Sequence, residues 1–257
     1  MTRIASGKVI FFITVLSLLL IFCRCSPSTV EQQKADPQPP MAKAAPPPAL
    51  AADPYSDPKG YFKIDPPPGW KKQEYPDDPR GKVAFAAPAD RTDLRVLAKA
   101  VDIPDFDALL NNLKEIEKQL GTPMNIQAVV FNKMPAFKRT ATVTLKGVTQ
   151  KFLWIDLLID GVSHNIQYSA PPNLFDTYQD MAWKSMQTYQ PLKRDKAASP
   201  EEARKHDAAK WIRLAKIAIE MGDAQAAKSA VAAGLETSPE NSDLLQLQKK
   251  LESQGAK

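Results

Sequence analysis

The chain has 257 residues, with Lys+Arg 34, Asp+Glu 29, two histidines, two cysteines and 23 prolines, which allows one medium domain and a small one. The formal charge of +5 divides into +3 over residues 1–52, +1 over residues 196–257 and +1 over the residues between them. No folded part therefore carries the concentrated basic patch that neutralises phosphates, which argues against a nucleic-acid-binding protein.

The N-terminal segment, residues 1–25, has the pattern of an export signal. Two cations precede fourteen uncharged residues, Val9–Phe22. Both cysteines of the chain, Cys23 and Cys25, follow and are lipidation candidates, although large residues precede them where a lipidation signal has a small one. Lipidation at a cysteine, an uncleaved anchor and ordinary cleavage near Cys25 all stay open. Each predicts an exported protein on the periplasmic side of a bacterial envelope, and the first two attach it to the membrane.

Residues 26–54 form a linker by composition. They are rich in proline, alanine and glutamine, and Pro46, Pro47 and Pro48 follow one another. Proline favours an extended polyproline geometry of about 3.1 Å per residue. We interpret this stretch as a spacer between a membrane surface and the next domain. The alternative is a proline motif that a partner domain binds.

The most informative part of residues 55–194, the predicted globular domain, is a hairpin over residues 151–170. Asp160-Gly161 lies between two apolar-rich runs, and Asp-Gly supplies the positive backbone angles that a two-residue hairpin turn needs. The outgoing strand, Phe152–Ile159, is nearly all apolar, as is typical of a central strand covered on both sides. On the return strand apolar and polar residues alternate, which predicts a sheet with one buried face.

Two amphipathic helices are expected to cover this sheet. Residues 104–120 carry apolar residues at helical spacing, with Pro104 in the first turn and Gly121 as the stop. Residues 172–189 repeat aromatic residues and methionines on one face. Further strands are predicted over residues 60–65, 82–86, 94–101, 126–131 and 137–145. The order predicts an α+β fold, an antiparallel sheet flanked by helices.

Short motifs lie at both ends of this domain. The first is the aromatic strand Gly60–Asp65 followed by three prolines, Gly69-Trp70 and a short strand, Gly81–Phe85. The second is a Gly161-containing turn and a strand ending in Tyr168-Ser169-Ala170, followed by a helix with Phe175 that leads to Met186-Gln187-Thr188-Tyr189. Together they resemble the PsbP-like (DcrB-like) family, and the resemblance covers about half of the chain. It implies an α-β-α sandwich used in secreted or lumenal accessory proteins and envelope lipoproteins, which assist or bind other proteins and share no catalytic motif.

Residues 199–254 predict a small all-α unit. Ser199 is suited to cap a helix that begins at Pro200. With Ala208 as position one, the spacing resembles a single tetratricopeptide repeat of 34 residues. Its packing positions hold Trp211, Leu214, Ala215, Ala218, Gly222, Ala227, Val231 and Pro239, and leucines at 244, 247 and 251 form a third, capping helix. One repeat cannot bury its apolar side alone, so the hairpin must pack on the sandwich domain, on a second copy or on a partner.

Few residues suggest chemistry. His164 and His206 are 42 positions apart, so a histidine metal site lacks support. We expect His164 to be a hydrogen-bonded core residue and His206 to be solvated. Asp102, Asp105 and Asp107 precede a helix, where exposed acids contribute about 0.3 to 1 kcal/mol each. They lack the glycine turn and further oxygen ligands of a calcium loop.

The sequence therefore predicts no catalytic, cofactor or metal site. Trp70, Trp154 and Trp211 are expected in the core, and no phosphate-binding glycine loop, nucleophile elbow or CxxC pair occurs. We predict a membrane-tethered envelope accessory protein that is a non-catalytic protein-binding or assembly module. Two alternatives stay open. One is a small-ligand binder or enzyme with a groove beside the 172–189 helix and His164, and the other is self-association through the C-terminal hairpin.

Overall fold

The computed structural model describes residues 53–254 apart from 76, 79–80 and 193–199, and these residues belong to one compact unit. The predicted export segment with Cys23 and Cys25, most of the predicted linker, and the predicted cap Ser199 lie outside the described residues. Within the described ranges, no helix is both long enough and apolar enough to cross a membrane.

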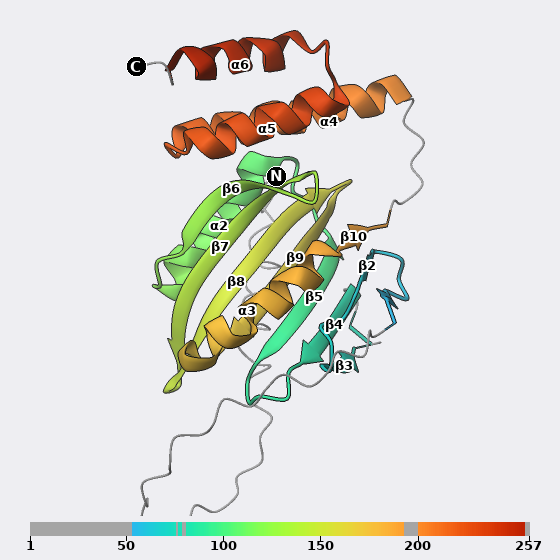
Figure 1. The fold of residues 1–257 in the computed structure, drawn as a ribbon, viewed down its shortest axis with the longest axis vertical. Coiled ribbons are helices and arrows are strands. Elements are labelled where there is room, and N and C mark those ends of the chain that lie inside the picture. Colours follow the sequence, from blue (N-terminus) through green and yellow to red (C-terminus); the bar gives the residue numbers. More distant parts are fainter. Residues whose placement is uncertain (1–52, 76, 79–80, 193–199, 255–257) are drawn as a thin grey trace, which may run out of the picture. The chain divides into compact units, whose positions relative to one another are not determined.

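A seven-stranded sheet forms the centre of the fold, in the order β3-β4-β5-β9-β8-β7-β6 (Figure 1). Every neighbouring pair in it is antiparallel. Its strands are β3 (Lys71–Glu74), β4 (Gly81–Ala86), β5 (Asp93–Ala100), β6 (Asn125–Phe131), β7 (Met134–Leu145), β8 (Val148–Ile159) and β9 (Val162–Ala170). A second sheet has the order β1-β2-β10, formed by β1 (Tyr55–Ser56), β2 (Phe62–Ile64) and β10 (Gln190–Pro191).

The central hairpin is confirmed. Asp160 and Gly161 connect β8 to β9 with positive φ angles of 49° and 73°, and Ile159 pairs with Val162 across the turn. Positive φ at both central residues is the geometry that matches the twist of two antiparallel strands. The apolar run of β8 therefore lies inside the sheet, between β7 and β9.

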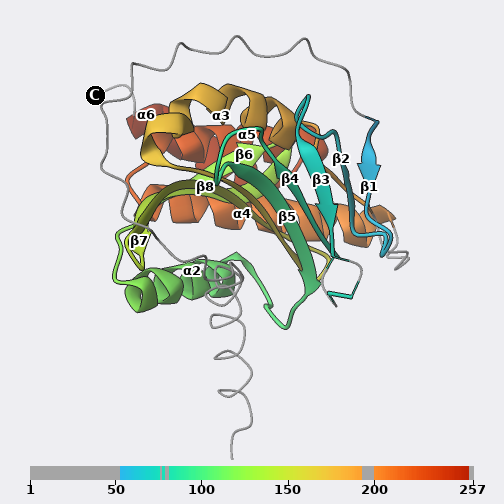
Figure 2. The same cartoon turned by 90° about the horizontal axis from the view of Figure 1, so that it is seen from below.

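Helices cover both faces of the sheet, as expected. Figure 2 shows α3 (Pro172–Gln187) on one side and α2 (Phe106–Leu120) on the other. Alternate residues of β8, such as Ile155, belong to the core cluster on the α3 side. Leu158, of the opposite parity, belongs to the cluster that contains α2. The predicted α+β class, an antiparallel sheet flanked by helices, is confirmed.

Helix α2 begins two residues later than predicted. Asp105 is its N-cap, with an extended φ of −157° and a side chain that accepts a hydrogen bond from the Ala108 amide at 2.9 Å. An aspartate in this position satisfies a free N–H of the first turn, so Pro104 stays outside the helix. The predicted stop is correct, because Gly121 has a left-handed φ of 59° and ends the helix.

The sequence pattern missed β1, β3 and β10 and placed the start of β7 at Phe137. Strand β7 begins at Met134 instead and includes Pro135. Its ladder with β8 starts only at Ala136, so the missing N–H of Pro135 removes no bond from that ladder. The turn before it, Asn132-Lys133, has positive φ at both residues and therefore closes a tight hairpin.

The C-terminal helices pack on the sheet domain. They are α4 (Pro200–Glu220), α5 (Ala224–Thr237) and α6 (Ser242–Gln254). Helices α4 and α5 lie against β6, and α4 also contacts β7 and α2. One continuous apolar cluster joins Phe106 and Leu110 of α2 to Trp211 and Leu214 of α4. The sheet domain thus covers the apolar side of the hairpin, so neither a second copy nor a partner is needed for that purpose.

Polar contacts reinforce this packing. Arg213 of α4 forms a charged hydrogen bond with Asp107 in the first turn of α2, which raises the pKa of the guanidinium. Lys210 approaches Asp160 in the β8–β9 turn at 3.9 Å. At the N-terminus of α2, Asp105 therefore caps the helix and Asp107 holds α4 against it.

Candidate functional site

The eight predicted helical-repeat positions are distributed through the α4–α5 hairpin. The side chains of Trp211, Leu214, Ala215, Ala218, Ala227 and Val231 are buried, Gly222 turns the chain after α4 with φ 77°, and Pro239 is exposed after α5. The six buried side chains belong to one apolar cluster with residues of α2 and β6. They therefore build the hairpin and its contact with the sheet domain.

Gly234 is a packing residue that the sequence reasoning missed. A Cβ at this position of α5 would lie 2.8 Å from the Trp211 Cβ and 2.9 Å from a methyl carbon of Leu244. Glycine is otherwise unfavourable in a helix interior, by about 0.8–1.0 kcal/mol relative to alanine. Its presence within a 14-residue helix was the available signal for this close approach of α4, α5 and α6.

His164 lies in a closed core. It is 2% exposed, and its Nδ1 is 2.5 Å from the hydroxyl of Tyr189, which is 1% exposed. Burial raises the pKa of the Tyr189 phenol well above its ordinary value. A ligand in solvent does not reach this imidazole, so the predicted groove beside α3 has no opening at His164. His206 lies in α4, and its side chain is outside the described part of the chain.

The three aspartates around the N-terminus of α2 do not come together as a metal site. Asp105 caps the helix, Asp107 pairs with Arg213, and Asp102 is exposed. In the described ranges, no group of three or more histidine, cysteine, aspartate or glutamate side chains is arranged to hold a metal ion.

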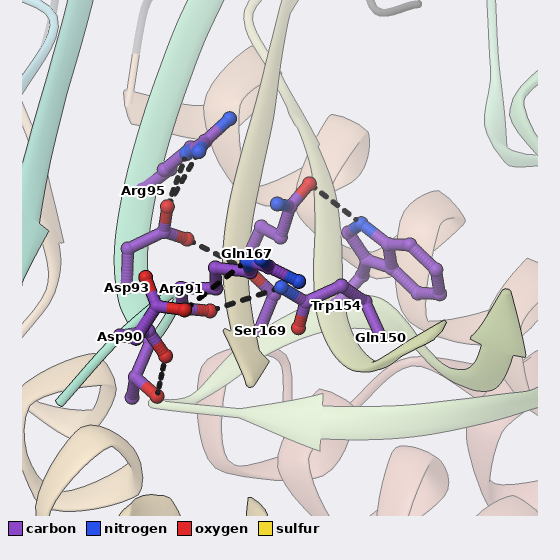
Figure 3. A network of polar contacts seen from close by, with 9 residues as sticks. Asp90, Arg91, Asp93, Arg95, Gln150, Trp154, Gln167 and Ser169 are labelled. Carbon is purple, nitrogen blue, oxygen red and sulfur yellow. Dashed lines mark hydrogen bonds and ion pairs between the residues drawn. The ribbon is translucent and has the colours of Figure 1, made fainter. Parts of the chain in front are cut away.

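A polar network lies on the sheet face opposite α3, across β5, β9 and β8 (Figure 3). The Asp93 carboxylate is its best-satisfied member. It accepts hydrogen bonds from Arg95 Nε at 2.9 Å, from Arg95 Nη2 at 2.5 Å and from Ser169 Oγ at 2.8 Å. Both carboxylate oxygens are occupied, which fixes β5 against β9 and leaves this acid poorly suited to general base chemistry.

Two amides extend the network towards β8. Gln167 Oε1 accepts a hydrogen bond from Trp154 Nε1 at 3.0 Å, and Gln150 Nε2 donates to the Arg91 carbonyl at 3.1 Å. The Gln150 Oε1 is buried and has no protein partner. On this face of β9, where the alternation predicts solvent-facing side chains, Gln167 and Ser169 are instead buried, and each hydrogen-bonds to a neighbouring strand.

A buried ion pair joins β7 to β8 on the same face. Arg139 Nε and Nη2 lie 2.6 and 3.1 Å from the two oxygens of Asp156, and both residues are 5% exposed. The guanidinium also lies 4.7 Å from the centre of the Trp154 ring, and Asn165 donates to the carboxylate at 2.8 Å. Arg139 and Asp156 hydrogen-bond to each other and to neighbouring protein groups, so we assign the ion pair a structural role.

A groove lies at the β3 edge of the main sheet, beside β1. Its volume is about 380 Å³, and its lining residues are Asp53, Pro54, Tyr55, Ser56, Pro66, Trp70, Lys72 and Glu74. Tyr55 and Trp70 are held in place by the core, since Tyr55 contacts Phe85 edge-on and Trp70 contacts Tyr168. Rigid aromatic rings therefore form its apolar side.

Charged groups border the groove. Lys72 and Glu74 of β3 form an ion pair of 2.9 Å, and the Lys72 ammonium lies 5.6 Å from the centre of the Tyr55 ring. Burial, together with the negative charges of Asp57 and Glu74, raises the pKa of Tyr55 to about 12. The phenol therefore stays protonated well above physiological pH. We take this groove, with the exposed strand beside it, as the candidate functional site.

The sequence signalled little of this site. Trp70 was expected in the core, and it is buried, yet it also lines the groove. Strand β3, Lys-Lys-Gln-Glu, has no apolar alternation, so nothing local marks it as a strand.

Comparisons with known proteins come from structure alone, because no family model and no curated protein matches the sequence. Several solved structures are similar to this chain, among them the following three. Cyanobacterial PsbP (CyanoP) from Synechocystis sp. PCC 6803 has 14% identity and a TM-score of 0.44, over 60% of this chain and 100% of that one. A protein from Bacteroides thetaiotaomicron VPI-5482 has 13% identity and a TM-score of 0.43, over 74% and 80%. LpqN, involved in cell envelope biogenesis of Mycobacterium tuberculosis, has 13% identity and a TM-score of 0.40, over 55% and 90%.

A PsbP protein is thus among the solved structures that this chain resembles. At these identities and TM-scores the likenesses do not assign the chain to a family.

Proposed function

We propose that this protein is an exported, membrane-tethered accessory protein of the cell envelope that binds other proteins and is not an enzyme. The N-terminal apolar segment and the proline-rich linker support the export and the tether. The sheet domain with its docked helices is then the part that meets the partner.

The observation that carries this proposal is the open edge of the main sheet at β3, with the groove beside it. Strand β3 pairs with β4 on one side only, and all four of its residues are exposed. An unpaired strand edge is a template for another chain, and proteins usually shorten, charge or cover it. The opposite edge, β6, is covered by α4 and α5, whereas β3 stays accessible in the described part of the molecule.

The test is crosslinking in cells with the full chain. A photoreactive amino acid replaces Gln73 on β3 in one variant and Gln248, an exposed glutamine of α6, in the matched control. We expect discrete protein adducts from position 73 and few from position 248. Adducts from neither position would overturn the proposal, and adducts from position 248 alone would move the binding surface to the helices.

Removal of the tail is unsuitable as the primary test. A chain that ends at Arg194 would expose the apolar surface of β6 and α2 that α4 and α5 cover. Adducts lost in that variant would then reflect a damaged fold as readily as a lost binding surface.

A further inference from the structure

We propose that the partner binds as an added strand: an extended segment pairs with the free edge of β3, places one large apolar side chain in the groove and carries carboxylates beside it. This inference rests on the proposed function, because it specifies how the partner is held at that same surface.

The backbone of β3 has unused hydrogen-bonding groups. In an antiparallel pair, residues alternate between those that exchange N–H and C=O bonds with the partner strand and those that point away. Four residues of β3 pair with β4, from Lys71 opposite Ala86 to Glu74 opposite Val83. Two of the four therefore direct their N–H and C=O groups outward, and no described residue pairs with them there.

The register also fixes where the side chains of an added strand point. Lys72 and Glu74 lie opposite Phe85 and Val83, whose side chains belong to the core on the α3 side. Alternate side chains of an added strand project to that same face, which is where the groove between β3 and β1 lies. Its volume of about 380 Å³ is within the range of about 300–1,000 Å³ that is usual for ligand pockets.

The charge of Lys71 on β3 favours an acidic partner segment. Lys72 is neutralised by Glu74 within β3, whereas Lys71 is exposed and forms no ion pair with any described residue. The side chain of Lys71 projects to the opposite face of the sheet from that of Lys72. On an added strand, the residue that pairs with Lys71 is therefore adjacent in sequence to the residue whose apolar side chain enters the groove. A carboxylate there faces an opposite charge, whereas a lysine faces a like charge. We therefore commit to an acidic extended segment of another protein as the occupant.

A second copy of this chain is the competing occupant, because its β3 has the same four-residue free edge. Light scattering of the full chain in detergent reports this case directly.

The probe is a fluorescent heptapeptide, Thr-Val-Glu-Phe-Glu-Val-Thr, titrated to millimolar concentration against the full-length protein and followed by anisotropy. When the peptide pairs with β3, its phenylalanine projects to the sheet face with the groove, and its two glutamates project to the face of Lys71. Matched peptides replace the phenylalanine with alanine, or both glutamates with lysine. Two further peptides carry N-methyl groups on alternate residues. One is methylated at its odd-numbered positions and the other at its even-numbered positions.

Strand addition predicts a distinctive pattern. Only one of the two N-methylated peptides loses binding, because only alternate N–H groups of the probe donate to β3. Lys71→Glu weakens the glutamate peptide about three- to ten-fold and restores binding of the lysine peptide, whereas Lys249→Glu on α6 changes neither. No binding at millimolar peptide, equal sensitivity to both methylation patterns, or no exchange of preference in Lys71→Glu each overturns the inference.

These outcomes separate the two proposals. If position 73 gives adducts in cells but both N-methylated peptides behave alike, protein binding at this surface stands and strand addition is excluded. If only one N-methylated peptide loses binding but position 73 gives no adducts in cells, strand addition stands and the proposed function is excluded. A defined dimer through β3 would replace the acidic partner with a second copy of the chain.

Discussion

The ion pair between Arg139 and Asp156 is buried between β7 and β8. Two guanidinium nitrogens meet two carboxylate oxygens, and Trp154 and Asn165 complete the surroundings. Burial makes each charge dependent on the other, because neither has water to replace a missing partner. Such a pair does little for net stability, yet its loss on one side is costly.

Asp156→Ala should therefore lower the free energy of unfolding by about 3 to 5 kcal/mol, since it leaves the buried Arg139 guanidinium without its counter-charge. Urea denaturation measures the effect. Asp90→Ala is the control, because the ion pair of Asp90 with Arg91 is exposed at the surface and should contribute less than about 1 kcal/mol. Equal effects in the two variants would show that burial of the Arg139 pair does not matter.

Buried tyrosines predict a loss of stability in alkali. Burial and neighbouring acids raise the pKa of Tyr55 from 10.0 to about 12, and burial raises the pKa of Tyr168 and of Tyr189 in the same direction. The unfolded chain releases these protons near pH 10 and the folded chain releases them later. Stability is therefore fully present below pH 10 and falls as the pH rises from 10 towards 12.

Unfolding midpoints between pH 8 and 12, with phenolate absorbance at 295 nm, measure this dependence. Tyr55→Phe should reduce the pH 10–12 slope without abolishing it, because it removes one of the three phenolic protons and leaves those of Tyr168 and Tyr189. A midpoint that stays constant to pH 12 in the unsubstituted protein would contradict the assignment.

At the scale of elements, the close contact of α4, α5 and α6 depends on Gly234. The extra methyl group of Gly234→Ala meets the Cβ of Trp211 at 2.8 Å, an atom that moves only with the backbone of α4. The gain in helix propensity is about 1 kcal/mol, and overpacking costs typically about 1 to 3 kcal/mol. We expect a net loss of stability from urea denaturation. Lys228→Ala on the exposed side of α5 should be nearly neutral, and a stabilised Gly234→Ala would show that the helices separate freely.

Element boundaries were predictable where a residue has a strong local preference. Gly121 ends α2, and Asp160-Gly161 turns the central hairpin, as their backbone preferences indicate. Helix α2 starts at Phe106 and not at Pro104, because the Asp105 side chain caps the first turn. Strand β3 was missed because its conformation comes from pairing with β4, not from an apolar pattern of its own.

At the scale of the whole molecule, the helical tail completes the sheet domain. The α4–α5 hairpin shares one apolar cluster with α2 and β6, and Arg213 bonds to Asp107 across that interface. Elements joined in this way unfold together, because separation exposes apolar area on both sides at about 25 cal/mol per Å².

Calorimetry of residues 53–257 should therefore give a single cooperative transition. A chain that ends at Arg194 should melt at a lower temperature and bind a hydrophobic dye, since β6 and α2 lose their cover. As a control, removal of residues 255–257 should change neither. Two independent transitions in the longer chain would show that the tail is a separate domain.

Features that depend on neighbours along the chain could be predicted from the sequence: the buried strand β8, its turn at Asp160-Gly161, the two amphipathic helices and the α4–α5 hairpin. The periodicity of apolar residues and the preferences of turn residues act over a few positions, so a sequence pattern reports them. Three other arrangements emerged from the fold alone: the sheet domain covers the hairpin, Arg139 pairs with Asp156, and β3 and β1 border a groove. Those arrangements join residues distant in sequence, and their energies come from packing and paired charges that no local pattern encodes.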